Sequence, residues 1–432
     1  MADLNPPTPP IPASDQSDPR LWPVATVMAT GVFATTFVQL QGLGYLPFNA
    51  ILINRMKLNS DQAATFISLS MLPWTFKIIA GLLVDSVPLF GSRRRGYLML
   101  SAFTAAVLWM LMGLVPGNYH LLLASAIGMN VAIVFGSTTS GGLLVEAGQR
   151  FRVSGRLSSL RVFAQNLGVG VGLFLGGLLA DYALGWTSAA AALPLLCMFF
   201  AAWFLLKEHP LTARADHGRG FVEQLLYVSL SITRQIKNVL RREMLLPALL
   251  LFFIQFVPTF RSTCFYEYQS QTLKYSDAAI GTLNSVGYGV ALLSSGVYAW
   301  WCRRASLRTS LYGAIFLVAL SALPYLLYTS YLPRALAIEG VGTFLLYLAY
   351  LPLFDLAVRS TPKGSEALGY SLLLSVWNIG LMISVKTGPM LYQRVLHHDM
   401  HQLIWINAGV TLAGVVFVFL LPKNLVEKRE GK

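Results

Sequence analysis

The stretch LPWTFKIIAGLLVDSVPLFGSRRRGY, residues 72–97, determines how the rest of the chain is interpreted. An apolar segment that carries Lys77 ends at an acid, Asp85, and a short turn then leads into the arginines Arg93–Arg95 and a second apolar run. Three arginines between two hydrophobic segments are typical of a tight loop on the cytoplasmic face of a membrane, where Lys and Arg accumulate. We therefore expect a membrane protein with a charged loop at this point.

The acid at the end of one helix can meet an arginine at the start of the next. Such an ion pair would stabilise one state of a protein built from two rocking halves. The gating candidates are therefore Asp85, Arg93, Arg94 and Arg95.

The composition predicts an all-α membrane protein. Of the 432 residues, 55% are hydrophobic and only 12% are charged, whereas a soluble domain carries about 25% charged residues. Apolar runs of about 20 residues, the length that crosses a bilayer, recur throughout. The net charge of +13 comes mainly from alternate loops, so it does not indicate nucleic-acid binding.

Twelve spans are predicted. They cover residues 23–53, 60–84, 96–115, 119–147, 154–182, 186–206, 244–271, 276–301, 307–328, 333–360, 365–393 and 401–421. One set of loops and tails holds 23 Lys and Arg residues and the opposite set holds 5. This bias places both termini in the cytoplasm of a multi-pass protein, which we expect in the inner membrane of the cell.

Two halves of the chain repeat each other. Phe37-Val38-Gln39-Leu40 matches Phe253-Ile254-Gln255-Phe256, and Asn166-Leu167-Gly168 matches Asn378-Ile379-Gly380, at offsets close to half the chain length. Parallel repeats of this kind place a substrate site near the midplane between the halves. The expected organisation is a disordered cytoplasmic tail (1–21), a six-helix bundle (22–206), a linker with a basic amphipathic helix (207–243), a second six-helix bundle (244–421) and a cytoplasmic tail (422–432).

The charged loop and the segment before it carry a family resemblance. The pattern D-x-x-P-x-x-G-x-R-R, together with Pro73, Trp74 and Lys77, resembles the folate-biopterin transporters, a branch of the major facilitator superfamily. Ile78 departs from that pattern, because the family usually has proline there. The resemblance implies secondary active transport of a small, anionic, folate- or pterin-like solute by alternating access, with proton-coupled symport as the expected energy source.

Polar residues inside the spans are the candidate site, since an ion at a helix centre costs about 2.5–3.5 kcal/mol. In the first span, Gln39, Gln41 and Tyr45 either line a pocket or hydrogen-bond neighbouring helices. In the second span, Lys77 has three interpretations: snorkelling inward, contact with an anionic substrate, or a structural pair with an acid.

The fourth and fifth spans add an acid and a cation. Arg161 shares a helix face with Gln165, beside Asn166, and is a candidate for a substrate carboxylate or for a pair with Glu146. Glu146 lies in Val145-Glu146-Ala147, which resembles a V-D-A-like motif of the family, and is interpreted as a coupling acid or a structural partner. Its nearness to Arg161 would suit proton coupling.

The second half supplies further candidates. Trp377 would stack on a flat ring or pack in the core, and Lys386 would bind or only snorkel. The substrate-binding candidates here are Gln255, Arg261, Asn284, Trp377, Asn378 and Lys386, and the further proton-coupling candidates are Glu339 and Asp355.

Motifs of other function classes are absent from the sequence. There is no Walker A, HExxH or GxSxG motif, and the histidines at 397, 398 and 401 are interpreted as a solvated loop, so we expect no enzyme, metal or cofactor. The expected partners are a small-molecule substrate, a coupling proton and the lipid bilayer, for a monomer. The alternatives are a muropeptide- or drug-exporting facilitator, a non-transporting membrane sensor or scaffold, and a membrane-embedded enzyme.

Overall fold

A computed structural model describes residues 20–58, 60–180, 182–208, 233, 235–257, 259–261 and 263–427. Helices fill almost all of these ranges, which confirms the predicted all-α class, and the described part holds one isolated β-bridge, between Leu89 and Ser92. The expected tail (1–21) and the linker helix within 207–243 lie largely outside the described residues.

The first half begins with a helix that is interrupted near its middle. Its helices are α1 (Leu21–Phe37), α2 (Tyr45–Asn49), η1 (Ala50–Arg55), α3 (Ser60–Met71), η2 (Leu72–Phe76), α4 (Lys77–Ser86), α5 (Arg95–Leu114), α6 (Tyr119–Arg150), α7 (Ser154–Leu179) and α8 (Leu184–Leu205).

The second half likewise begins with an interrupted helix. Its helices are α10 (Arg242–Phe256), α11 (Thr263–Glu267), η4 (Tyr268–Thr272), α12 (Asp277–Trp301), α13 (Leu307–Ala322), η5 (Leu323–Leu327), α14 (Leu332–Ser360), α15 (Glu366–Arg394), α16 (Met400–Ala413), α17 (Val415–Leu420) and α18 (Lys423–Val426). The helices follow the twelve predicted spans, and nine stretches within the described residues are long and apolar enough to cross a membrane.

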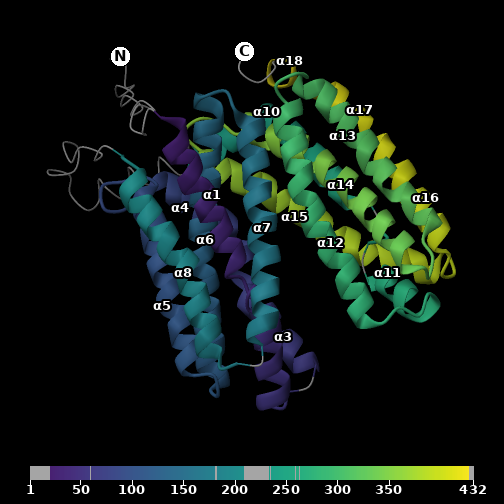
Figure 1. The fold of residues 1–432 in the computed structure, drawn as a ribbon. Helices are drawn as coiled ribbons and strands as arrows, with labels where there is room; N and C mark the ends of the chain where they lie inside the picture. Colours follow the sequence, from purple (N-terminus) through teal and green to yellow (C-terminus); the bar gives the residue numbers. More distant parts are fainter. Residues whose placement is uncertain are drawn as a thin grey trace.

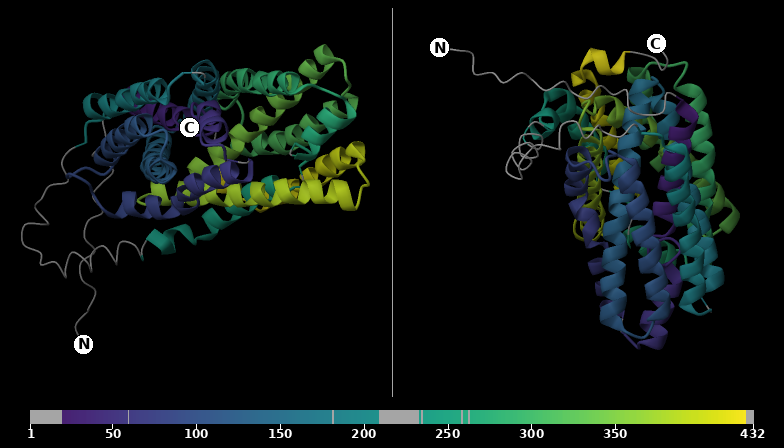
Figure 2. Two further views of the ribbon diagram at one scale, coloured as in Figure 1. Left: turned by 90° about the horizontal axis from the view of Figure 1, so that it is seen from below. Right: turned by 90° about the vertical axis from the view of Figure 1, so that its left-hand side faces the viewer.

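Two groups of helices diverge from a common end. Helices α1–α8 form one group and α10–α18 the other, and the groups meet at the end where both termini lie (Figure 1). Seen from below, the two groups lie mainly on opposite sides (Figure 2). Contact between them runs through α4 and α6 against α15, and through α7 against α12 and α14.

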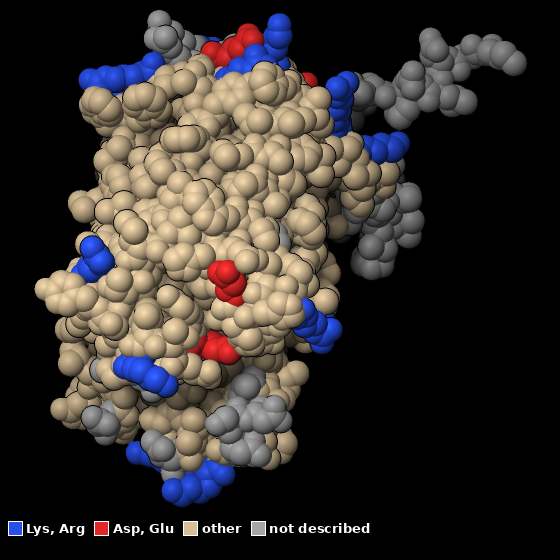
Figure 3. Space-filling view, turned by 90° about the vertical axis from the view of Figure 1, so that its right-hand side faces the viewer, with Lys and Arg blue, Asp and Glu red and all other residues tan. Residues whose placement is uncertain are grey.

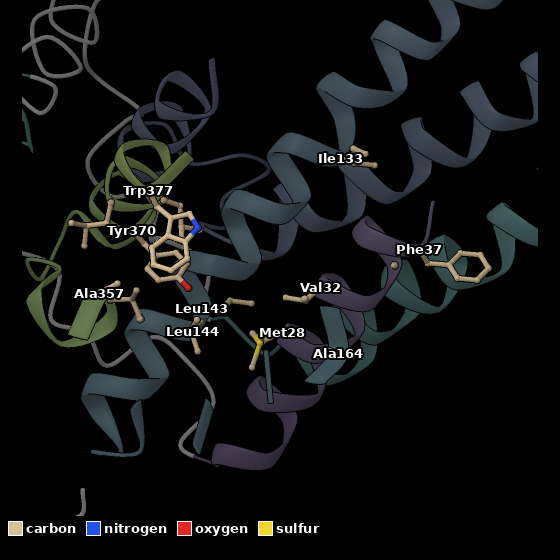
Figure 4. Packing of buried hydrophobic residues seen from close by; sticks show 14 of the residues in the cluster. Met28, Val32, Phe37, Ile133, Leu143, Leu144, Ala164, Ala357, Tyr370 and Trp377 are labelled. Carbon is tan, nitrogen blue, oxygen red and sulfur yellow. The ribbon is translucent and has the colours of Figure 1, made fainter. Parts of the chain in front are cut away.

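The apolar residues divide between a shared core and a lipid-facing surface. One buried cluster draws on both halves, and Figure 4 shows Tyr370 and Ala357 of the second half near Leu143 and Leu144 of α6. On the outside, a broad uncharged area covers most of the upper half of one face below a rim of charged side chains, and separate acidic and basic side chains lie in the lower half (Figure 3). This distribution is that of a protein surrounded by lipid.

The first helix of each half breaks near its middle, and both breaks are followed by a short α-helix and a π-helical turn. In the first half the break lies between Phe37 and Tyr45, where the N–H of Leu43 bonds to the carbonyl of Phe37 at 3.0 Å. Glycines of α7 pack directly against it: a side chain at Gly176 would collide with the carbonyl oxygen of Leu43. The second break repeats the arrangement, with Gly388 of α15 against the carbonyl of Thr259.

We expect Gly176→Ala to destabilise the fold, because its methyl group would strike a carbonyl oxygen, and overpacking of this kind costs about 1–3 kcal/mol. Its neighbour Gly177 is the matched control, since a methyl group there meets only Leu46 at 3.6 Å. Thermal melting of the two purified variants should show a lower melting temperature for Gly176→Ala alone. Equal melting temperatures would contradict the close contact.

Candidate functional site

A network of buried charges joins the two halves at the end where both termini lie, which we call the closed end. The carboxylate of Asp85 lies 2.8 Å from Nη1 of Arg94 and 3.2 Å from Nη2 of Arg93, and its other oxygen accepts the N–H of Leu368 at 2.8 Å. Because Leu368 lies in the first turn of α15, the acid also meets the positive end of that helix. The pairing of Asp85 with the loop arginines therefore matches the sequence prediction.

The second half contributes its own acid to this network. Glu366, at the start of α15, lies 2.8 Å from Arg93 and 3.4 Å from Arg94. We call Asp85, Arg93, Arg94 and Glu366 the latch. The sequence analysis missed Glu366, since only the fold brings residues 272 or more positions apart into contact. Arg95 does not join them: its guanidinium lies 5.3 Å from the ring of Trp203 on α8.

Two of the predicted coupling acids belong to the closed end. Glu146 lies 3.9 Å from Nε of Arg94, so among the described ion pairs its partner is Arg94, and the expected pair with Arg161 is not formed. Asp355 is bonded to Arg359 at 2.9 Å, one turn away on α14, and accepts the hydroxyl of Tyr298 at 3.1 Å. Both acids already have a cationic partner.

Lys77 and Arg161 lie together between the halves. The buried amine of Lys77 donates to the hydroxyl of Ser137 at 3.0 Å and lies 5.3 Å from the ring of Trp74. The guanidinium of Arg161 lies 5.1 Å from the ring of Phe354 in the second half, and the charges of Arg161 and Lys77 interact. The interpretation of Lys77 as snorkelling does not fit its burial.

Aromatic rings continue from Arg161 across the second half. Phe354 lies 5.2 Å from Trp377, and Trp377 meets Tyr350 edge-on at 4.9 Å. Tyr350 lies close to the buried amide of Gln255 and to the charge of Arg261. We call this set the cation–aromatic cluster: Lys77, Arg161, Phe354, Trp377, Tyr350, Gln255 and Arg261.

The cations of this cluster form no direct ion pair with an acid among the described residues. No carboxylate of the described residues lies within ion-pair distance of Lys77, Arg161 or Arg261, and one buried guanidinium nitrogen of each arginine has no hydrogen-bond acceptor there. Cation–π contacts of this kind contribute about 0.5–2 kcal/mol each, which is less than the free energy of hydration that an ion loses on burial. A bound anion would therefore supply a favourable counter-charge at this cluster.

The remaining candidates do not all reach this cluster. Gln41 and Tyr45 are exposed at the break after α1, Gln39 and Gln165 are half-buried, and the amide of Asn166 bonds to its own helix at Val162. Asn378 and Lys386 are exposed on α15, and the side chain of Asn284 lies outside those described. The sequence analysis also missed Tyr350 and Phe354, although Tyr347, Tyr350 and Phe354 follow the i, i+3, i+7 spacing of one helix face.

Comparison with known proteins gives matches over nearly the whole chain. The model of the BT1 family matches residues 40–432. The folate-biopterin transporter of Synechocystis sp. is 27% identical over 93% of this chain and 84% of its own length, and folate transporter 1 of Plasmodium falciparum is 22% identical over 92% and 80%.

Solved structures match in fold. The major facilitator superfamily proton:xylose symporter XylE superposes with a TM-score of 0.66 at 13% identity, over 93% of this chain and 96% of its own. The human organic anion transporter MFSD10 superposes with a TM-score of 0.68 at 14% identity, over 93% and 100%. At these identities the likeness concerns the fold alone.

We expect Asp85→Asn to open the closed end, because the change removes a buried charge that balances two arginines. A cysteine placed at Ser137, in a background without the native cysteines, should then react faster with a thiol reagent added on the side of the termini. Arg308→Gln is the control, because its ion pair with Glu427 at the same end is exposed. Equal labelling rates in both variants would show that Asp85 does not hold this end closed.

Proposed function

The chain belongs to the BT1 family, and on that premise we propose that it moves a flat heteroaromatic anion of the folate or pterin class across the membrane by alternating access, coupled to protons. The BT1 relatives are transporters, and the fold is that of the major facilitator superfamily, so the chain is a multi-pass transporter and not an enzyme. The substrate class, the coupling ion and the roles of residues are our proposal.

One observation supports this substrate class above others. Arg161, which contacts Phe354 of the other half, Lys77 and Arg261 form no direct ion pair with a carboxylate in the described part, and they lie near a row of aromatic rings. An anionic ligand would supply the missing counter-charge, and planar rings would pack against Trp377 and Tyr350. A neutral sugar would supply no counter-charge, which favours an organic anion with an aromatic part.

Each part of the cluster then has a role. Arg161 and Lys77, from the first half, bind a carboxylate of the substrate, while Trp377, Phe354 and Tyr350, from the second half, contact its ring system. A ligand that bridges both halves in this way has different contacts in the two states of the transporter. Differential affinity of this kind is what allows a ligand to bias a conformational equilibrium.

The latch separates the two states of the cycle: it is formed in this structure, and its opening would give the second state. The structure is closed at the end that carries the termini, and the excess of Lys and Arg on that side supports a cytoplasmic position for this end. The cluster is then reached from outside the cell, and opening the latch would release the substrate inward. We propose residence in the inner membrane and both termini in the cytoplasm on this basis.

We expect folic acid or a pterin to raise the melting temperature of the purified protein, since a ligand that binds only the folded state stabilises it. Sugars, amino acids and muropeptides added in parallel should have no effect. Stabilisation by a muropeptide alone would instead support the exporter.

Arg161→Gln should weaken binding of the same ligand, because a hydrogen bond to a charged group contributes about 1.5–3 kcal/mol, a factor of about 10–150 in affinity. Lys386→Gln is the matched control: it also removes an intramembrane cation, but one that is exposed. Uptake into vesicles should fall for Arg161→Gln only. Unchanged affinity and uptake in both variants would exclude Arg161 from the site.

A further inference from the structure

Glu339 differs from the other acids between the helices of this protein in the partners that surround it. Glu146 lies near Arg94, and Asp355 is bonded to Arg359. Glu339 is buried, and in the described part of the chain no cation lies within ion-pair distance of it. Both of its oxygens instead accept phenolic hydroxyls, from Tyr325 at 2.6 Å and from Tyr328 at 3.2 Å.

Tyr325 connects this acid to the cation–aromatic cluster. Its hydroxyl donates to Glu339, and the face of its ring lies 4.5 Å from the guanidinium of Arg261. Gly342, one turn after Glu339 on α14, makes the space, because a Cβ atom there would lie 2.7 Å from Nη2 of Arg261. The charges of Arg261 and Glu339 interact across the ring without a direct ion pair.

We propose that Glu339 is the proton-coupling acid of this transporter and that Tyr325 is the positioning residue that links its protonation to anion binding at Arg261. This inference rests on the function proposed above, and it names the coupling residue within that site. In the substrate-free state, the carboxylate of Glu339 balances the charge of Arg261 through Tyr325. The arriving anion takes over that role and leaves Glu339 as a second negative charge nearby.

The proton balance follows from this competition. When the anion binds Arg261, Glu339 takes a proton from water and becomes a neutral carboxylic acid, and when the anion leaves, the proton returns to water. One proton therefore accompanies each anion. By linkage, protonation of Glu339 strengthens anion binding by the same factor by which anion binding strengthens protonation.

The groups that face Glu339 allow this exchange. They are Arg261 from the segment before α11, and Tyr325 and Tyr328 from η5 and the residue after it. Tyr328 in turn accepts from the amide of Gln269 on η4 at 2.8 Å. Of the two phenols, only Tyr325 is in cation–π contact with Arg261.

The first test measures protons directly. Folic acid is added to the purified wild-type protein in a weakly buffered solution, at a pH where its carboxylates are ionised, and the change in pH is recorded. We expect uptake of one proton for each bound folate and an affinity that falls by up to about tenfold for each pH unit above the titration of Glu339. Binding without proton uptake would overturn the inference and leave the proposed function standing.

The second test compares substitutions around the acid. Glu339→Gln should bind folic acid with an affinity independent of pH and without proton uptake, whereas Glu339→Asp should retain uptake. In vesicles, Glu339→Gln should exchange labelled folate for unlabelled folate but should not accumulate it when a proton gradient is applied. Proton-driven accumulation by a folded Glu339→Gln protein would also overturn the inference.

Two tyrosine variants form the matched pair. Tyr325→Phe keeps the ring on Arg261 but removes its bond to Glu339, so proton uptake should fall while folate still binds. Tyr328→Phe also removes a bond to Glu339 but leaves the Arg261 contact intact, so uptake should persist. Equal uptake in both variants would exclude Tyr325 as the link. If folic acid does not bind the wild type at all, the proposed function and the inference fall together.

Discussion

The cost of an unbalanced charge inside a membrane protein organises this structure. At the closed end, buried Asp85 and Glu366 meet the arginines of the loop within 2.8–3.4 Å, so the charges there balance each other. Nearer the middle, Lys77 contacts a hydroxyl, Arg161 and Arg261 contact aromatic rings, and none of the three forms a direct ion pair within the described ranges. The ion pairs at the closed end stabilise one conformation, whereas the three cations nearer the middle would be stabilised by an additional negative charge.

Close packing at small residues determines where Arg261, one of these cations, lies. Glycines of α7 and α15 fit against the carbonyls of the two broken helices, where any larger residue would collide. The pattern repeats in both halves, with Gly168 and Gly176 at the positions of Gly380 and Gly388. The second break also has a side-chain hydrogen bond, in which the hydroxyl of Ser384 on α15 donates to the carbonyl of Val257. Packing against neighbouring helices therefore stabilises both breaks, and Arg261 lies in the second one.

The two ends of the molecule are linked through α14 and α15. Helix α15 starts at the latch with Glu366 and carries Trp377 of the cation–aromatic cluster. Helix α14 carries Asp355 near the closed end, then Phe354 and Tyr350, and finally Glu339. A movement that opens the latch would therefore also shift the rings that we propose contact the substrate and the acid that we propose takes the proton. This continuity gives a physical route for coupling between gate, site and proton.

The sequence by itself determined the class of fold, the positions of the spans and the pairing of Asp85 with the loop arginines, because hydropathy, charge bias and near neighbours are local properties. It also supplied Arg161, Arg261 and Glu339 as candidate site residues, since ions stand out in apolar segments. One of its alternatives paired Glu146 with Arg161, whereas Glu146 lies near Arg94, and it overlooked Glu366, Tyr350 and Tyr325. Only the tertiary structure decided those contacts, because they join helices far apart in sequence, and helix packing alone sets which faces meet.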